Sequence, residues 1–149
     1  MNDPTSIREY AGPVAVTLGY LTSYYLSIGN VLRVKGALQR EYRARGETFD
    51  RYATPDKRML AADRVQLNTL EHMPPFLALL WLDAALVSAL HATVLGGAYL
   101  ASRLAYPLMV GRQLGTGAPR HIFRVTGVGY AALGLLAADL VRALVRAAV

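Results

Sequence analysis

The sequence predicts an all-α integral membrane protein, a single domain of four membrane-spanning helices. Hydrophobic residues make up 54% of the 149 positions and charged residues only 17%, and the apolar residues are gathered in long blocks. A spanning helix needs about 20 mostly apolar residues, and Tyr10 to Leu32 is an uncharged block of that size. The length suits one domain.

The first half of the chain predicts two spanning helices joined by a charged connector. The first helix is expected at about 13–34, where small and hydroxyl residues suit close packing against other helices. The connector covers residues 35–63 and overlaps the start of the second helix. That helix is expected at about 57–90, longer than a bilayer requires, and Pro74 and Pro75 should bend it.

The second half predicts two further spanning helices. A short uncharged turn at residues 91–97 makes the second and third helices an antiparallel hairpin, with the third at about 93–114. Residues 115–119, Gly-Thr-Gly-Ala-Pro, form a helix breaker whose proline suits a helix start. The fourth helix is therefore expected at about 119–147.

Basic residues set the expected orientation in the membrane. The positive-inside rule places the two connectors that are rich in them in the cytoplasm, and both termini outside or in a lumen. Because these residues flank spans and form no patch with interleaved aromatics, we expect no nucleic-acid partner. The basic residues of these connectors and the adjoining helix starts are Lys35, Arg40, Arg43, Arg45, Arg51, Lys57, Arg58, Arg64, Arg112, Arg120 and Arg124.

The cysteine and histidine content limits the chemistry that the protein's own side chains can perform. The chain has no cysteine, so a cysteine nucleophile and a cysteine-based metal site are impossible. Any thiol must be brought in by a ligand. His72, His91 and His121 are too scattered along the chain to suggest a metal site.

Polar side chains share one face of the second helix where it enters its apolar block. Arg64, Asn68 and Glu71 follow the spacing i, i+4, i+7, which puts them on one face. Gln66 lies about 200° around the helix from Arg64, so it should face another helix or another subunit. Ionisable groups within a membrane are costly and by default suggest a functional site.

The third helix carries one deeply placed cation. Arg103 lies about 11 residues, roughly 16 Å, from the cytoplasmic end of its helix. Because the second and third helices are antiparallel neighbours, an ion pair between Arg103 and Glu71 is plausible. Two interpretations stay open: a buried pair that locks the two helices, or a polar pocket, which the neighbouring polar groups favour.

Two acids are expected at the opposite interface. Asp83 and Asp139 each lie about 19 residues, roughly 28 Å, from the cytoplasmic ends of their helices. Arg142 could pair with either of them, so we expect a structural role for both.

These patterns resemble the MAPEG family, the membrane-associated proteins of eicosanoid and glutathione metabolism. Residues 64–71, Arg-Val-Gln-Leu-Asn-Thr-Leu-Glu, with a proline and Phe76-Leu77 after them, resemble the signature of its second helix. Residues 101–106, Ala-Ser-Arg-Leu-Ala-Tyr, resemble a segment of its third helix. The four-span layout with a charged connector after the first helix also agrees, so the resemblance covers nearly the whole chain.

The resemblance implies a homotrimer that binds glutathione in a U shape between neighbouring subunits, near the cytoplasmic side. Glutathione carries two carboxylates, an ammonium and amides, and arginine recognises carboxylates through paired hydrogen bonds. By match of position, Tyr106 would lie near the thiol, and His72 stands where many members have a tyrosine. The residues implied to hold glutathione are Arg33, Arg64, Gln66, Asn68, Glu71, His72, Arg103 and Tyr106.

The resemblance also implies that an arginine at the start of the fourth helix stabilises the thiolate for nucleophilic attack. The family's position falls on Gly117 or Pro119 here, and neither residue can do this. Arg120 is the nearest candidate and Arg124, one turn later on the same face, is the second. Both also fit the role of ordinary basic residues at a helix end. A further tyrosine of the family pattern is Val110 here.

The expected function is that of a glutathione-dependent membrane transferase or peroxidase whose lipophilic substrate arrives from the bilayer. The alternative is a non-catalytic member that binds a lipid and presents it to a partner enzyme. That alternative gains if neither Arg120 nor Arg124 faces the pocket. A small channel or transporter is less favoured, because nothing polar runs the length of any helix. The expected membrane is a bacterial inner membrane or an endoplasmic reticulum.

Overall fold

The part of the chain that the structure describes is helical and contains no strand. The computed structural model describes the backbone of residues 4–110 and 120–149 and the side chains of residues 7–109 and 124–149. This confirms the all-α class, while the four-span bundle and the trimer stay predictions. The helices are α1 (Pro4–Glu9), α2 (Ala11–Ala44), α3 (Lys57–Leu86), α4 (Ala89–Val110) and α5 (Arg120–Ala147).

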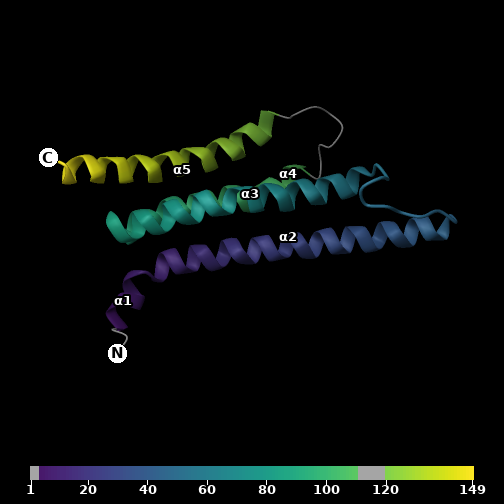
Figure 1. The fold of residues 1–149 in the computed structure, drawn as a ribbon, viewed down its shortest axis with the longest axis horizontal. Coiled ribbons are helices and arrows are strands. Elements are labelled where there is room, and N and C mark those ends of the chain that lie inside the picture. The colour runs from purple at the N-terminus through teal and green to yellow at the C-terminus, as the bar shows by residue number, and fades with distance from the viewer. Residues whose placement is uncertain (1–3, 111–119) are drawn as a thin grey trace.

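The four long helices run side by side in three layers (Figure 1). α3 and α4 contact each other and form the middle layer, and both contact α2 on one side and α5 on the other. α1 and the C-terminal end of α5 lie at one end of the molecule, and the connection from α2 to α3 lies at the opposite end. The middle pair is therefore covered on two faces.

α2 is longer than the sequence led us to expect. The expected end near residue 34 is wrong, because the helix continues to Ala44. Residues 35–44 are mostly good helix formers, and Leu38 and Tyr42 pack against Phe49 and Met59 from the connector and the start of α3. The added turns therefore have a small core of their own.

A glycine ends α2. Gly46 adopts the left-handed conformation, with φ of 74°. Its N–H donates to the carbonyl of Arg43 at 3.0 Å, and the N–H of Glu47 donates to the carbonyl of Tyr42 at 2.9 Å. This closes the last turn of the helix, as C-terminal glycines commonly do.

The remaining helix boundaries differ by a few residues from those expected. α1 is a short helix that no sequence pattern predicted. α3 ends at Leu86 and α4 begins at Ala89, earlier than the expected 90 and 93, because the N–H groups of Val87 and Ser88 both donate to the carbonyl of Asp83 at 2.9 Å. The expected end of the third helix, at 114, lies outside the described residues.

Local chemistry explains the course of α3. The Asp56 carboxylate accepts a hydrogen bond of 2.8 Å from the N–H of Arg58 and caps the first turn. The helix is continuous through Pro74 and Pro75. One turn before them, the hydroxyl of Tyr20 on α2 donates a hydrogen bond of 2.7 Å to the carbonyl of Thr69. This bond ties α2 to the turn in which the polar residues of α3 lie.

Three aromatic rings form the centre of the main core. Tyr20, Phe76 and Tyr99 are fully buried. The ring centres of Phe76 and Tyr99 are 4.2 Å apart, and those of Tyr20 and Phe76 are 5.0 Å apart. Because the three rings come from α2, α3 and α4, they set the register of these helices and thereby place Arg103, one turn after Tyr99.

Candidate functional site

The polar residues of α3 fall into an exposed set and a half-buried set. Arg64 and Glu71 are exposed, whereas Gln66, Asn68 and His72 are half-buried. The expected common face of Arg64, Asn68 and Glu71 is therefore divided, since only Asn68 turns inward to a neighbouring helix. In the single chain, the side of α3 with Arg64 and Glu71 is exposed.

Arg103 is the buried charge of the site. It lies on α4 with 3% of its surface exposed, and its Nη1 group donates a hydrogen bond of 2.9 Å to Oδ1 of Asn68. Its guanidinium carbon lies 5.2 Å from the ring centre of Tyr99 and 5.8 Å from that of Tyr106. Within the described part of the chain, its Nε and Nη2 groups have no acceptor.

The expected ion pair between Arg103 and Glu71 is absent from the described side chains of the chain. No ion pair of Arg103 occurs among the described side chains, and its partner is the neutral amide of Asn68. Glu71 follows Asn68 by three residues and is turned about 60° around the helix axis, which brings its carboxylate to the open face. The interpretation of a locked ion pair is therefore set aside, and the polar pocket stays a prediction.

This environment favours a bound anion. Aromatic faces attract a cation with about 0.5–2 kcal/mol, but they do not satisfy N–H groups. A buried cation without an opposite charge is costly, and a guanidinium with two free donors suits a carboxylate or another anionic oxygen. Arg103 could therefore bind a carboxylate or another anionic oxygen.

His72 and Tyr130 form a second polar contact beside Arg103. His72 Nε2 and the hydroxyl oxygen of Tyr130 on α5 lie 3.4 Å apart, within hydrogen-bonding distance. The ring centres are 5.5 Å apart and the planes meet at 62°. We call Asn68, His72, Arg103 and Tyr130 the central polar cluster, which joins α3, α4 and α5.

A glycine brings α5 close enough for this contact. A Cβ atom at Gly129 would lie 2.6 Å from Oγ of Ser102 and 3.0 Å from Nη2 of Arg103, so only a glycine fits without a shift. No role was predicted for Tyr130. A signal for it exists in the sequence, since Tyr130 follows this glycine and is the one aromatic residue between Arg124 and Asp139.

The other predicted residues lie in different surroundings where their side chains are described. Arg33 is exposed on α2 and donates a hydrogen bond of 2.8 Å to Oδ1 of Asn30. Tyr106 is half-buried beside Arg103, and Arg124 is exposed on α5. Arg120 is the first residue of α5, and its side chain lies outside the described residues. The roles of these residues stay predictions.

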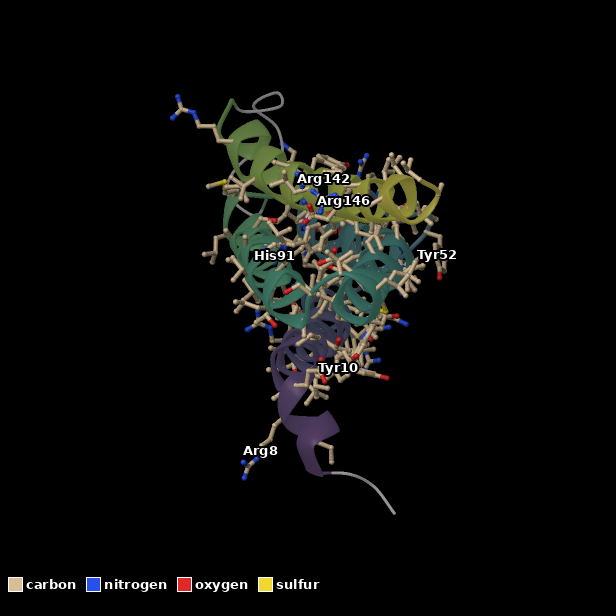
Figure 2. All side chains as sticks on the ribbon, turned by 90° about the vertical axis from the view of Figure 1, so that its left-hand side faces the viewer. Arg8, Tyr10, Tyr52, His91, Arg142 and Arg146 are labelled. Atoms are coloured by element: carbon tan, nitrogen blue, oxygen red, sulfur yellow. The ribbon has the colours of Figure 1, made fainter. Side chains whose placement is uncertain are left out.

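The opposite end of the molecule holds a separate group of charges. Arg142 donates a hydrogen bond to Asp139, and Nδ1 of His91 lies 3.9 Å from the same carboxylate. Figure 2 shows Arg142 and His91 at the end that faces the viewer, whereas Arg8 points away from the long helices. The expected pairing of Arg142 with one of the two acids is confirmed for Asp139. Asp83 is fully buried, and neither carboxyl oxygen has a partner in the described part.

An apolar groove lies between the C-terminal halves of α3 and α5. Its volume is about 470 Å³. It begins about 15 Å beyond His72, since Leu82 follows His72 by ten residues on α3. The residues that line it are Leu82, Leu86, Leu140, Ala143, Leu144 and Ala147.

Within the described residues, one segment, Arg124–Ala147, is long and apolar enough to cross a membrane. The chain belongs to the MAPEG family, whose sequence model matches residues 12–142. This is a membrane-associated family that includes glutathione transferases, peroxidases and proteins of lipid metabolism. No curated protein matches the chain.

Proposed function

We propose that the protein is a membrane transferase or peroxidase that uses glutathione to attack a lipophilic electrophile. The observation that carries this proposal is Arg103, a buried cation that donates a hydrogen bond to the Asn68 amide and whose Nε and Nη2 groups have no acceptor among the described residues. Glutathione would be a co-substrate that supplies the anion for Arg103 and the thiol for the reaction. Membership of a family that includes glutathione transferases supports the same choice.

The residues fit the chemical groups of glutathione. Arg64 and Arg103 would bind the two carboxylates, Glu71 the ammonium, and Gln66 and Asn68 the peptide groups. Arg33, His72 and Tyr106 complete the proposed binding set, with Tyr106 near the thiol. Arg120, or in second place Arg124, would stabilise the thiolate.

A homotrimer would complete this site. Arg64 and Glu71 are exposed in one subunit and have no polar partner among the described side chains. A second subunit packed on this face of α3 would enclose the peptide between the two chains. The lipophilic substrate would enter from the bilayer, and the basic connectors would face the cytoplasm.

One observation favours the alternative of a non-catalytic lipid-binding protein. The groove between α3 and α5 is lined entirely by aliphatic side chains, and Arg124 is exposed. A lipid could be held there and presented to a partner enzyme without a thiol reaction.

Binding and turnover, measured together, distinguish these functions. The full-length protein in detergent micelles is titrated calorimetrically with glutathione, and conjugation of an activated aryl halide is followed in the same preparation. Arg103→Met should weaken binding about tenfold or more, since hydrogen bonds to a charged group contribute about 1.5–3 kcal/mol. Asn68→Asp should also weaken glutathione binding, because the new aspartate carboxylate would pair with the Arg103 guanidinium.

The controls and contrary results are specific. Arg146→Ala, which removes an exposed arginine at the opposite end, should bind and react like the parent. Absence of glutathione binding by the parent would refute the proposal, and binding without turnover would favour the lipid-binding alternative. Full activity in Arg120→Ala would show that Arg120 does not stabilise the thiolate, and Arg124 would become the first candidate for that role.

A further inference from the structure

We infer that His72 is the base that takes the proton from the thiol of bound glutathione, with Tyr130 holding its imidazole in place. This inference rests on the proposed function and assigns a step that an arginine cannot perform. An arginine stabilises negative charge but keeps its own protons, so a thiol that ionises beside it must release its proton elsewhere. A neutral imidazole can accept that proton.

The position of His72 suits this task. It follows Asn68 by one helical turn, about 6 Å along α3, and Asn68 accepts the hydrogen bond from Arg103. A tripeptide spans about 10 Å when extended. A thiol peptide whose carboxylate is held at Arg103 can therefore reach His72 with its thiol.

Tyr130 supplies the orientation. With His72 Nε2–H donating to the hydroxyl oxygen of Tyr130, 3.4 Å away, the lone pair of Nδ1 stays free to accept a proton. Fixing one ring nitrogen by a hydrogen bond is how proteins set which nitrogen acts. The edge-to-face contact of the two rings limits rotation of the imidazole. Tyr130 is thus a positioning residue.

The charges around His72 come from two helices. Glu71 lies beside it on α3, and Arg103 faces it from α4. Among the described residues, Tyr130 is the titratable group of α5 in contact with it. A glutathione carboxylate bound to Arg103 would offset the positive charge at the moment when His72 accepts its proton.

The reaction balances without another reagent. The S–H bond of glutathione breaks and its proton moves to Nδ1 of His72. The sulfur forms a bond to the electrophilic carbon of an activated aryl halide, and halide leaves with the bonding electrons. His72 then returns the proton to solvent, so the net products are the conjugate, halide and one proton.

Proton counting tests the inference directly. Glutathione is titrated into the full-length protein at pH 7 in two buffers that differ in ionisation enthalpy, and thiolate absorbance in the ultraviolet is recorded in parallel. The parent should form thiolate while releasing almost no proton, because His72 keeps it. Thiolate formation with release of about one proton per bound glutathione would overturn the inference and leave the proposed function intact. A parent that binds no glutathione would refute both.

Variants provide a second readout. His72→Gln, saturated with glutathione, should lose the thiolate signal at pH 7 and conjugate the aryl halide about 100-fold more slowly, as expected for the loss of a general base. Its rate should recover as pH approaches the free thiol's pKa of about 8.5. His91→Gln, at the other end of the molecule, is the matched control and should behave like the parent.

Tyr130 is tested by removal of one atom. Tyr130→Phe keeps the ring contact but loses the acceptor, so the thiolate fraction at pH 7 should fall severalfold with unchanged glutathione affinity. Tyr25→Phe, at an exposed tyrosine of α2, is its control. Retention of the full thiolate signal and rate in both His72→Gln and Tyr130→Phe would overturn the inference.

Discussion

At the scale of single residues, the location of Arg103 could be predicted from the sequence, whereas its hydrogen-bond partner depends on packing. Its place in an apolar helix marked it as a candidate from sequence, because an unneeded charge would be too costly there. Its partner could not be deduced, since a rotation of about 60° around α3 decides between Asn68 and Glu71. Tyr130 was missed for the same reason, because its relevance depends on how α5 meets α3.

Gly129 should be essential for the approach of α5. Gly129→Ala is expected to lower the free energy of unfolding by about 1–3 kcal/mol, as for an overpacked contact, because the added methyl group would meet Ser102 and Arg103. Chemical denaturation in detergent measures this.

Gly134 is the matched control on the same helix. A Cβ atom at Gly134 meets nothing within 4 Å, so Gly134→Ala should leave stability unchanged or raise it by up to about 1 kcal/mol through helix propensity. Equal effects of the two substitutions would show that α5 does not pack closely on α4.

The carboxyl group of Asp83 should lower the free energy of unfolding. It is fully buried and neither carboxyl oxygen has a partner in the described part, so Asp83→Leu is expected to raise the free energy of unfolding by about 1–3 kcal/mol. Asp83→Asn keeps a buried polar group of the same shape and should gain less. A loss of stability in Asp83→Leu would mean that the carboxyl group has a partner in the assembled protein.

At the scale of elements, the sequence located the long helices but misplaced the end of α2. Hydrophobicity marks where a span can lie, and α2 continues beyond that region because Leu38 and Tyr42 find partners on the connector and α3. These contacts are long-range, so a pattern read along one helix does not show them.

Leu38 should anchor the extension of α2. It is 1% exposed, and Leu38→Ala is expected to cost about 2–5 kcal/mol. Because the loss is local, hydrogen exchange should increase most in residues 35–62. Leu32→Ala, at an exposed position of the same helix, should change little. Unchanged exchange in Leu38→Ala would contradict this packing.

The Glu41–Arg58 pair should make the extension sensitive to acid. Arg58 donates hydrogen bonds of 2.9 and 2.7 Å to Glu41, and these hold the pKa of Glu41 below its ordinary value of 4.5. A lowered pKa means that the pair stabilises the fold above pH 4.5 and that this contribution is lost as pH falls through the folded-state pKa. The Tm of the parent should therefore fall more steeply below about pH 4.5 than that of Glu41→Gln. Parallel curves would contradict the assignment.

At the scale of the whole molecule, the side of α3 that carries Arg64 and Glu71 is a surface that no other part of the described chain covers. Arg64 and Glu71 are exposed there in a membrane-family protein, and charges facing lipid are costly. Packing against further copies of the chain would cover them.

The homotrimer proposed above predicts three copies in the assembled protein. Native mass spectrometry from detergent should give a trimer, and Leu67→Glu, at an exposed position between Arg64 and Glu71, should weaken it. Leu90→Glu, exposed at the far end, is the control. A fully active monomer would contradict the proposed shared site.

The sequence by itself determined the all-α class and the approximate places of the long helices, which follow from composition and period along the chain. The motifs of the second and third helices resemble the MAPEG family, and that resemblance implied most of the candidate residues. Only the tertiary structure decided that Arg103 meets Asn68, that His72 meets Tyr130, and that α2 extends over the start of α3. Each of these depends on helix rotation and on close approach between helices far apart in the chain, where a shift of an ångström or of a few tens of degrees changes the partner.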